Sequence, residues 1–424
     1  MIGQLDVMLW GRKVGTLVAG KKGSATQICF YFNPDFVRSG YDIAPLRASI
    51  HGNAAINGFP IYPESNKLFG GLPSMIADSL PDHWGNIVFS EWARQKGIRM
   101  KDLTSLDRLA YIGRRGMGAL EFIPPTSSHL ESPFMIEISD LSELADKAMD
   151  EAKGFHADLK TDFMVESLFK VGTSAGGRRP KAVINVNQST GECYSGQVAS
   201  PLPGFTPMII KFEEKGNIPT TRIEYSFYLM AKSAGLWMMP SNIIKTKGRY
   251  HFLTERFDRK GDEKIHIQTL AAMNPYSDSY EDLFDVASRL ALPPEEMSRL
   301  FRQMTLNTAC GNVDDHNKNF SFMMAPDGIW HLAPAYDFTF TVDPEAPDYV
   351  NVHSMTINGK NRDIDRKDLL EIAQRFNVKD ANAIINTILD TASRYRTFGN
   401  EAGVNENWIS TIEAEIQDRM EYLS

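Results

Sequence analysis

The feature that most constrains the fold is a polar loop that follows a predicted helix and precedes a predicted hairpin. The loop contains Asp314 and, five residues later, Asn319, and a further acid, Asp337, follows in a Tyr-Asp-Phe sequence. Before the loop, residues 300–309 are largely apolar and typical of a helix. After it, two short apolar runs flank a Pro-Asp-Gly turn at 326–328, which predicts a hairpin. We expect this arrangement to bring both acids to one end of a small sheet.

The order acid, amide, acid is also the order of the phosphoryl-transfer residues in protein kinases. There the catalytic-loop Asp accepts the proton of the substrate hydroxyl, the Asn five positions on holds Mg²⁺, and a later Asp-Phe-Gly aspartate binds the metal. The offset from Asp314 to Asn319 matches, but the His-Arg-Asp tripeptide and the Gly after Asp-Phe are missing. The pattern therefore indicates kinase-like chemistry, but it does not match the motifs of a conventional eukaryotic-type kinase. An ordinary polar turn stays open as an alternative, because Asp, Asn and His are common in turns.

Composition places the chain among globular proteins of two or three domains. It has 424 residues, of which 42% are hydrophobic and 23% charged. The net charge of −8 argues against a whole-protein grip on nucleic acid, although 113–116 and 176–181 are locally basic. There is no apolar run of about 18 residues and no signal-like N-terminus, so we expect a cytoplasmic protein without a membrane span. Three cysteines have neither metal-site spacing nor the pattern of a disulfide framework: Cys29, Cys193 and Cys310.

The pattern along the chain predicts an α+β protein with three parts. Residues 1–125 alternate short apolar runs with turns, which predicts a small antiparallel sheet with a helix at about 82–96, and we interpret this part as an N-terminal accessory subdomain. Residues 126–255 begin with a helix and continue with strands. Residues 256–424 show mostly helical spacing.

The middle part contains a Gly-rich turn at 172–177 that leads into an apolar strand. Backbone N–H groups in such a turn can hold phosphates, because glycines let the main chain approach closely. The turn is not a Walker A loop, since Ala182 follows Lys181 where Ser or Thr would be needed for Mg²⁺. A flexible surface hairpin is the alternative.

A lysine and a glutamate follow in the order that kinases use. Lys211 closes an apolar run and resembles the strand lysine that contacts the ATP phosphates, and Glu224 near the start of the next helix could pair with it. The alternatives are a lysine that faces solvent and a glutamate favoured by the helix dipole. Residues 250–259 then read as a strand ending in a charged crossover, which could link two lobes and present backbone groups to an adenine.

Taken together, these segments resemble one family, the HipA serine/threonine kinases, which are toxins of bacterial toxin–antitoxin pairs. The resemblance covers most of the chain, including the Gly-Gly-Leu-Pro to Leu-Pro-Asp stretch at 70–82. Its most specific pieces are Glu-Arg-Phe-Asp-Arg at 255–259 and Asp-Asp-His-Asn-Lys-Asn-Phe at 314–320. It is also carried by 174–181, 209–211 and 332–337.

The resemblance implies a two-lobed protein-kinase-like fold with an N-terminal β-rich accessory subdomain. The N-lobe would cover residues 126–255, and the mostly helical C-lobe residues 256–424. It implies ATP and Mg²⁺ as cofactors, with Asp314 as the catalytic base and Asn319 and Asp337 as metal ligands. It implies autophosphorylation of Ser174. The implied ATP-binding residues are Lys211, Glu255, Phe257, Ser174, Ala175, Gly176, Gly177, Lys181, His316 and Lys318. Some relatives carry Gly at the position of Asp315, so a second carboxylate competes here for the role of Asp314.

The resemblance further implies a toxin that phosphorylates a translation-related protein, for example an aminoacyl-tRNA synthetase. A small HipB-like helix-turn-helix antitoxin would neutralise it and would be its only link to DNA. Two other functions stay open at this point. One is a small-molecule phosphotransferase on the same lobes, since aminoglycoside kinases use a similar loop. The other is a non-catalytic partner of a DNA-binding repressor.

Overall fold

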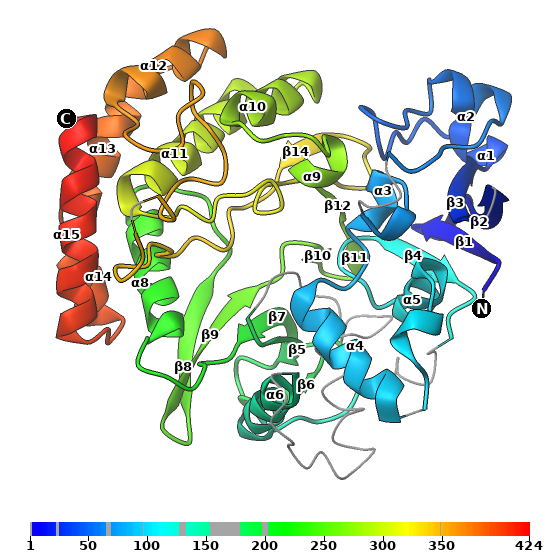
Figure 1. The fold of residues 1–424 in the computed structure, drawn as a ribbon, viewed down its shortest axis with the longest axis horizontal. Coiled ribbons are helices and arrows are strands. Elements are labelled where there is room, and N and C mark those ends of the chain that lie inside the picture. Colours follow the sequence, from blue (N-terminus) through cyan, green and yellow to red (C-terminus); the bar gives the residue numbers. More distant parts are fainter. Residues whose placement is uncertain are drawn as a thin grey trace.

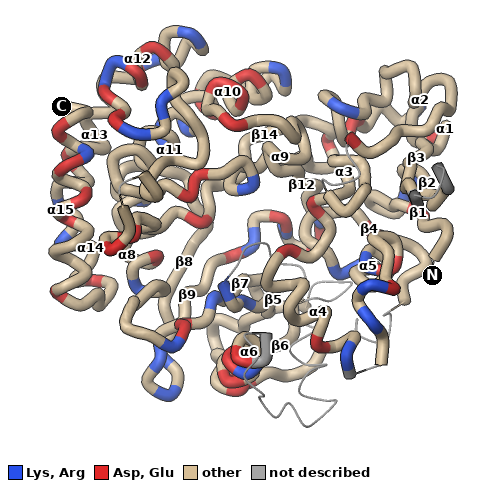
Figure 2. Tube along the Cα trace, viewed as in Figure 1, with Lys and Arg blue, Asp and Glu red and all other residues tan. Residues whose placement is uncertain are grey.

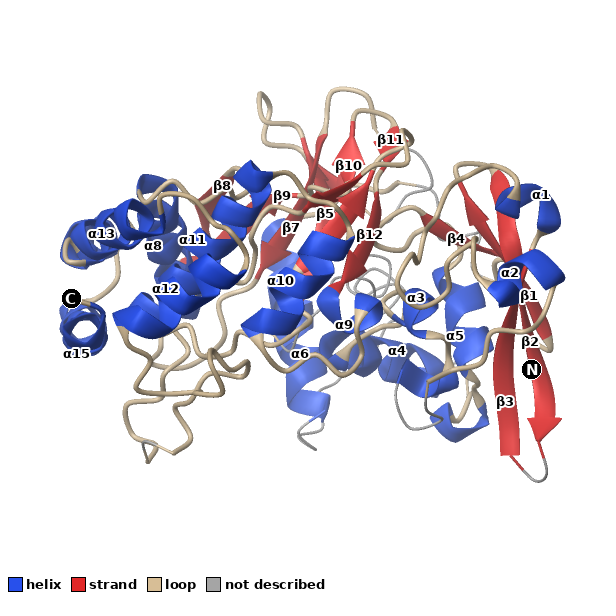
Figure 3. Ribbon diagram, turned by 90° about the horizontal axis from the view of Figure 1, so that it is seen from above, coloured by secondary structure: helices blue, strands red, loops and turns tan. Residues whose placement is uncertain are grey.

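The computed structural model describes residues 2–22, 25–64, 69–95, 97–126, 133–152, 179–196, 202–347 and 349–424. In these ranges the chain is an α+β structure, as predicted. A five-stranded sheet lies between a β-rich N-terminal region and a group of C-terminal helices (Figures 1 and 3). The predicted Gly-rich turn at 172–177 lies outside the described residues.

The N-terminal region is built on an antiparallel sheet with strand order β3-β2-β1-β4, which confirms the predicted small sheet. Along β1 the residues Leu5, Val7 and Leu9 are buried in alternation, because successive side chains of a strand point to opposite faces. The strands are β1 (Gln4–Leu9), β2 (Arg12–Lys22), β3 (Ala25–Phe32) and β4 (Leu120–Ile123). The short helical elements of this region are α1 (Pro34–Val37), α2 (Asn53–Asn57), η1 (Phe69–Gly71), α3 (Ser74–Ala77), η2 (Met100–Asp102) and α5 (Ser105–Ile112).

The central sheet is also antiparallel, with strand order β6-β5-β7-β9-β8. Its strands are β5 (Lys181–Val186), β6 (Cys193–Ser195), β7 (Thr206–Lys211), β8 (Ser241–Thr246) and β9 (Arg249–Glu255). Two helices pack against it, α4 (His83–Gln95) and α6 (Ile138–Ala152), and share one apolar cluster with it. The cluster takes Trp84 and Phe89 from α4, and Ala182 and Ile184 from β5. Thus α4, predicted as a helix of the accessory part, completes the core of the central sheet.

The register of β5 and β7 decides where two lysines point. Lys181 lies directly opposite Lys211, and Ala182 lies opposite Ile210. Because Ala182 and Ile210 belong to the cluster under α4 and α6, the alternation along the strands puts both lysines on the other face of the sheet.

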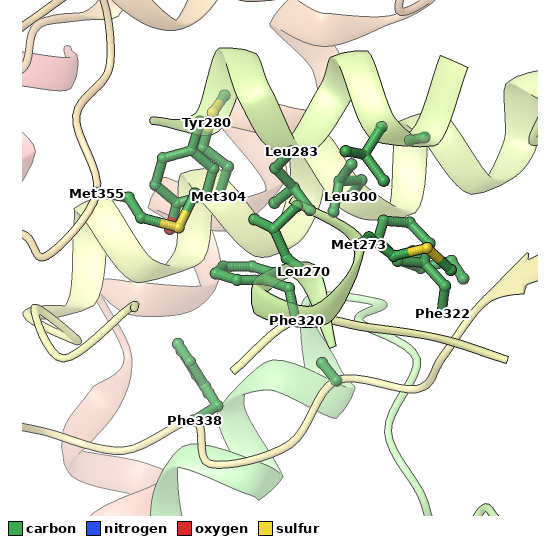
Figure 4. Packing of buried hydrophobic residues seen from close by; sticks show 14 of the residues in the cluster. Leu270, Met273, Tyr280, Leu283, Leu300, Met304, Phe320, Phe322, Phe338 and Met355 are labelled. Carbon is green, nitrogen blue, oxygen red and sulfur yellow. The ribbon is translucent and has the colours of Figure 1, made fainter. Parts of the chain in front are cut away.

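The C-terminal region is mostly helical and contains a three-stranded sheet of order β12-β13-β14. Figure 4 shows this core, in which Leu283 and Leu300 from two helices lie near Leu270 and Phe320. The strands are β12 (His266–Thr269), β13 (Ser321–Met324) and β14 (Trp330–Leu332), preceded by a short pair, β10 (Arg259–Lys260) and β11 (Glu263–Lys264). The helices are α8 (Thr220–Ser233), α9 (Leu270–Met273), α10 (Tyr280–Arg289), α11 (Pro294–Cys310), α12 (Arg366–Arg375), α13 (Ala381–Ala392), α14 (Tyr395–Glu401) and α15 (Glu406–Leu423).

The predicted helix before the polar loop and the hairpin after it are both present, as α11 and as β13 paired with β14. Gly311 ends α11 in the left-handed conformation, with φ of 69°. A side chain there would be strained and would also crowd Phe340 and Val342. The helix therefore stops where the polar loop begins.

The described part of the chain carries charges of both signs on its helices, and its cysteines lie inside the structure. Acidic and basic residues are interspersed along α12 and α15 (Figure 2). Every helix among the described residues is too short or too polar to cross a membrane. All three cysteines are buried and free.

One buried cluster of charges joins the N-terminal region to the segment after β9. Asp258 is fully buried and accepts hydrogen bonds from Arg256, at 2.7 and 2.8 Å, and from Arg259, at 2.5 Å. The main-chain N–H of Gly118 also donates to it, at 2.8 Å, and Arg259 donates in turn to the carbonyls of Gly116 and Gly118. Burial raises the pKa of Asp258, but the two guanidinium groups outweigh it and hold that pKa well below its usual range.

We predict that Asp258→Asn lowers the free energy of unfolding by about 3–5 kcal/mol, since removing one partner of a buried ion pair leaves the other charges uncompensated. Urea unfolding at neutral pH measures it. Because the folded pKa lies below the unfolded value, the difference between wild type and variant should shrink as the pH falls through the range where an unfolded Asp takes up a proton. Asp35→Asn, at an exposed pair with Arg38, is the control and should change little. A loss at Asp258 no larger than in this control would contradict the prediction.

Candidate active site

The site begins with a buried lysine that two carboxylates share. Lys211 ends β7, and its Nζ lies 2.5 Å from Oε1 of Glu224 on α8. The same Nζ pairs with the carboxylate of Asp337. Lys211 is 9% exposed and Glu224 is 4% exposed, so the alternative of a lysine facing solvent is wrong. Burial lowers the pKa of Lys211, but Asp337 and Glu224 outweigh it and raise that pKa, which keeps the ammonium charged.

Asp337 is held in an uncommon backbone conformation and in a positive field. Its φ is 52°, in the left-handed region that Asp adopts more readily than most residues. Burial raises its pKa, but Lys211, Lys181 and Arg179 outweigh that effect and hold the pKa well below its usual range. The carboxylate is therefore ionised at any physiological pH.

The residue after Asp337 anchors the segment to α8. Phe338 is buried, and its ring lies 5.3 Å from the ring of Phe227, one turn along the helix from Glu224. Phe227 also contacts Phe340 and Tyr395. Glu224 and Asp337 are thus fixed relative to each other by apolar packing as well as by their common partner Lys211.

Lys181 brings a second buried cation to this face of the sheet. It is 3% exposed and lies opposite Lys211 in the sheet. Burial lowers its pKa and so does the charge of Lys211, while Asp337, Asp82 and Glu224 oppose this. Lys211 pairs with Asp337, and Lys181 and Arg179 act electrostatically on the same carboxylate, so the local field is positive and suited to polyanions such as phosphates.

The polar loop separates its two adjacent acids completely. The side chain of Asp314 is 62% exposed, and the main-chain N–H of Asp314 donates to Oγ1 of Thr341 at 3.1 Å. Asp315 is fully buried and accepts hydrogen bonds from Tyr280, His353 and Ser354. Of these two carboxylates, that of Asp314 is open to solvent and that of Asp315 is not.

The remaining residues of the loop close a compact turn. The Asn319 side chain donates through Nδ2 to the carbonyl of Asp314 at 2.7 Å, and its main-chain N–H donates to the carbonyl of His316 at 2.8 Å. Nδ1 of His316 accepts from the N–H of Lys318 at 3.2 Å. The Lys318 side chain is exposed and acts electrostatically on Asp78 and Asp82 of the N-terminal region.

Tyr336 connects this loop to the crossover after β9. Its hydroxyl donates to the carbonyl of Lys318 at 2.8 Å, and its ring stacks on Phe257 with centroids 5.7 Å apart. Glu255, at the end of β9, accepts a long hydrogen bond from Gln188 at 3.4 Å. The structure thus joins Phe257 to the loop through Tyr336. The expected residues Ser174, Ala175, Gly176 and Gly177 lie outside the described residues.

Sequence reasoning missed Asp82, which belongs to the predicted accessory subdomain. Burial, with a contribution from Asp337, raises its pKa to about 6, against the opposing effects of Lys181, the Gly85 N–H and Lys318. Trp84 lies two residues after Asp82, in α4, and donates its indole N–H to the carbonyl of Lys181 at 2.8 Å. A Leu-Pro-Asp sequence before a helix is a recognisable N-terminal signal, but it does not reveal that the helix starts beside Lys181.

The donor set suits Mg²⁺ held together with phosphates. Mg²⁺ usually keeps several waters and takes one or two protein carboxylates plus substrate oxygens. Asp337 supplies an ionised carboxylate, and Oδ1 of Asn319 accepts no hydrogen bond from the residues that the structure describes. Within those residues no three His, Cys, Asp or Glu side chains gather as an all-protein metal site. Asp337 and Asn319 each carry an oxygen of the kind that Mg²⁺ takes as a ligand.

Comparison with known proteins identifies both halves of the chain. The HipA N-terminal domain matches residues 5–123, and the HipA-like C-terminal domain matches residues 173–395. The Sinorhizobium fredii protein named "Putative kinase Y4mE" is 25% identical over 299 residues, which is 66% of this chain and 65% of that relative's length. The matched part of this chain therefore spans slightly less than two thirds of that relative's length.

A solved structure has the same overall fold. A chain of the Shewanella oneidensis MR-1 toxin–antitoxin complex of HipA, HipB and operator DNA superimposes with a TM-score of 0.67 at 17% identity, covering 99% of this chain and 97% of that one. The predicted two-lobed, kinase-like fold with a β-rich N-terminal region is confirmed. With two family domains that together span most of its length, the chain belongs to the HipA family.

Proposed function

We propose that this protein is an ATP-dependent serine/threonine-protein kinase of the HipA toxin type. The observation that carries the proposal is the buried Lys211, shared between Glu224 on a helix and Asp337 of the Asp-Phe segment. A kinase needs this lysine–glutamate pair and this aspartate in place together. A non-catalytic scaffold has no need to bury a lysine and a glutamate beside a partly buried aspartate, because desolvating charges is costly.

In the proposed reaction the acceptor hydroxyl oxygen attacks the γ-phosphorus of ATP. The bond from that phosphorus to the β–γ bridging oxygen breaks, and ADP leaves. Asp314 takes the proton of the hydroxyl, a role that its exposed carboxylate can fill. Lys211 and Lys181 hold the phosphates. Bound Mg²⁺ would neutralise charge on the phosphates, held by Asp337 and Asn319.

The partners follow from the family. The Shewanella oneidensis structure contains HipA together with HipB and operator DNA. By analogy we infer a small helix-turn-helix antitoxin as the partner of this chain, with DNA reached only through it. The net charge of −8 supports an indirect link to DNA. The protein substrate is inferred to be translation-related, as in the family.

Our first prediction concerns the two acids assigned to chemistry. Asp314→Asn should lower the rate of phosphate transfer by about 10²–10⁴-fold, the usual contribution of a general base, while Mg-ATP still binds. Asp337→Ala should abolish transfer, because a metal ligand is lost. Intact mass after incubation with Mg-ATP, together with the initial rate of ADP formation, measures both. Wild-type turnover in Asp337→Ala would falsify the metal-ligand role. An active Asp314→Asn beside an inactive Asp315→Asn would reverse the assignment of the base.

Our second prediction concerns nucleotide affinity. Lys211→Ala should weaken ATP binding by about 10- to 100-fold in calorimetry, since a hydrogen bond to a charged group contributes about 1.5–3 kcal/mol. Glu224→Gln should weaken it less, because it removes the orienting partner and leaves the ammonium. The control is Lys215→Ala, because that lysine is 66% exposed and lies four residues further along the chain. An unchanged dissociation constant in Lys211→Ala would exclude the role, and no effect in Glu224→Gln would exclude only the pairing.

Our third prediction concerns Ser174, which lies outside the described residues. Phosphorylation would add about −1.5 to −2 charges to the Gly-rich turn and should repel the phosphates of ATP. Phosphosite mapping after Mg-ATP incubation should find Ser174, and the modified protein should bind ATP more weakly than Ser174→Ala. Thr173→Ala is the control and should still be modified. Phosphate found only at other residues would contradict the assignment of Ser174. Normal ATP binding by the phosphorylated protein would contradict the inhibitory effect of the phosphate.

A further inference from the structure

The second acid of the polar loop has no part in the reaction proposed above. We propose that Asp315 is a positioning residue, which fixes the backbone that presents Asp314 by accepting three hydrogen bonds on the buried side of the loop. This inference rests on the proposed function and assigns a role to a side chain that the reaction itself never touches.

The contacts of Asp315 are short and come from separate parts of the chain. Its Oδ2 accepts from the Tyr280 hydroxyl at 2.7 Å and from Nδ1 of His353 at 2.8 Å. Its Oδ1 accepts from the main-chain N–H of Ser354 at 2.8 Å. A buried carboxylate with three donors is fixed in one orientation. Because the peptide bond joining it to Asp314 is planar, that orientation restricts the neighbouring backbone as well.

The hydrogen bonds that hold Asp315 continue through Tyr280 and reach the loop again at Asn312. The Tyr280 hydroxyl also accepts from Nδ2 of Asn307 on α11, at 2.9 Å. Oδ1 of Asn307 accepts in turn from Nδ2 of Asn312, at 2.9 Å. Asn312 and Asp315 lie on either side of Asp314 in the loop, and both are buried. The exposed acid is therefore held between two buried anchors that share one set of hydrogen bonds.

The last helix fixes which nitrogen of His353 carries hydrogen. Nη1 of Arg419 on α15 lies 3.3 Å from Nε2 of His353. A guanidinium only donates, so Nε2 is assigned as the acceptor and Nδ1 as the N–H that points to Asp315. Arg419 is itself held by Glu415, at 2.6 Å. Arg419 on α15 thus sets the tautomer of His353 in which Nδ1–H donates to Asp315.

The first experiment uses Asp315→Asn, which keeps the side-chain volume but turns one acceptor into a donor. In one orientation the new amide N–H faces the N–H of His353, and in the flipped orientation it faces the main-chain N–H of Ser354. Initial rates of ADP formation against Mg-ATP concentration should show kcat reduced by about 10- to 100-fold, the effect of a small misplacement of a reacting group. KM for Mg-ATP and the stoichiometry of ATP binding by calorimetry should stay at wild-type values, because Lys211 and Asp337 are untouched.

The second experiment tests whether a second substitution restores the kcat that Asp315→Asn loses. A purely structural role of Asp315 would not give this recovery. Arg419→Met removes the donor at Nε2, so His353 can move its hydrogen there and accept from the new amide. We expect Asp315→Asn combined with Arg419→Met to recover part of the lost kcat. The matched control is Asp315→Asn combined with Arg394→Met, since Arg394 is a half-exposed arginine paired only locally with Asp390. That combination should recover nothing.

Each outcome decides the inference. Wild-type kcat in Asp315→Asn overturns it, and so does a loss of ATP-binding stoichiometry that parallels the loss of kcat. A double variant with Arg419→Met that is no faster than Asp315→Asn overturns it as well. If Asp315→Asn does not fold, Tyr280→Phe replaces it. Reduced kcat with unchanged ATP affinity then supports positioning, and unchanged kcat refutes it.

The proposed function fails in a distinguishable way. A wild-type protein that binds Mg-ATP but forms no ADP overturns the kinase proposal and this inference together. An active wild type with an equally active Asp315→Asn overturns the positioning role alone.

Discussion

The ammonium group of Lys211 is the point on which the arrangement of the lobes depends. It ends a strand of the central sheet, and its two carboxylate partners come from α8 and from the segment after β14. Leaving a buried charge without a partner is strongly destabilising, so these three segments must close together. The packing of Phe338 on Phe227 reinforces the same closure with apolar contact. The three segments are therefore tied together at one point by charge and by apolar contact.

The polar loop shows how one short sequence serves two purposes. Neighbouring acids have opposite environments, Asp314 in solvent and Asp315 fully buried. The exposed acid is available for proton transfer. The buried one has every donor it needs, and its charge is stabilised by hydrogen bonds from Tyr280, His353 and Ser354 rather than by water.

Sequence periodicity was sufficient for most elements of the fold. It predicted the N-terminal sheet, α4, α8, α11 and the hairpin of β13 and β14, because alternation and helical spacing report locally which side of an element is buried. The pairing of Lys211 with Glu224, 13 residues apart, was suggested by the order in which kinases place these two residues and not by periodicity. The sequence left open that Lys211 faces solvent and that Glu224 is favoured only by the helix dipole. Spacing along the chain does not show whether a lysine at the end of a strand is buried.

What the sequence could not reveal depends on contacts between distant segments. The juxtaposition of Lys181 and Lys211 depends on strand register, which neither strand encodes alone. Asp82 reaches the same place from a different domain, and His353 meets Asp315 from 38 residues away. Periodicity identifies a face that needs covering but not the segment that covers it. The role of Ser174 stays a prediction.

The indole of Trp84 has a consequence for how the chain is divided. Family boundaries separate residues 5–123 from 173–395, yet Trp84 and Phe89 lie in the core of the central sheet, and Gly118 donates to the buried Asp258. A C-terminal part produced by itself would expose the apolar face of that sheet and leave the carbonyl of Lys181 without its indole donor. The two family domains therefore share one core in this structure, and substitutions in α4 would reach Lys181 and Lys211 through the sheet that holds both lysines.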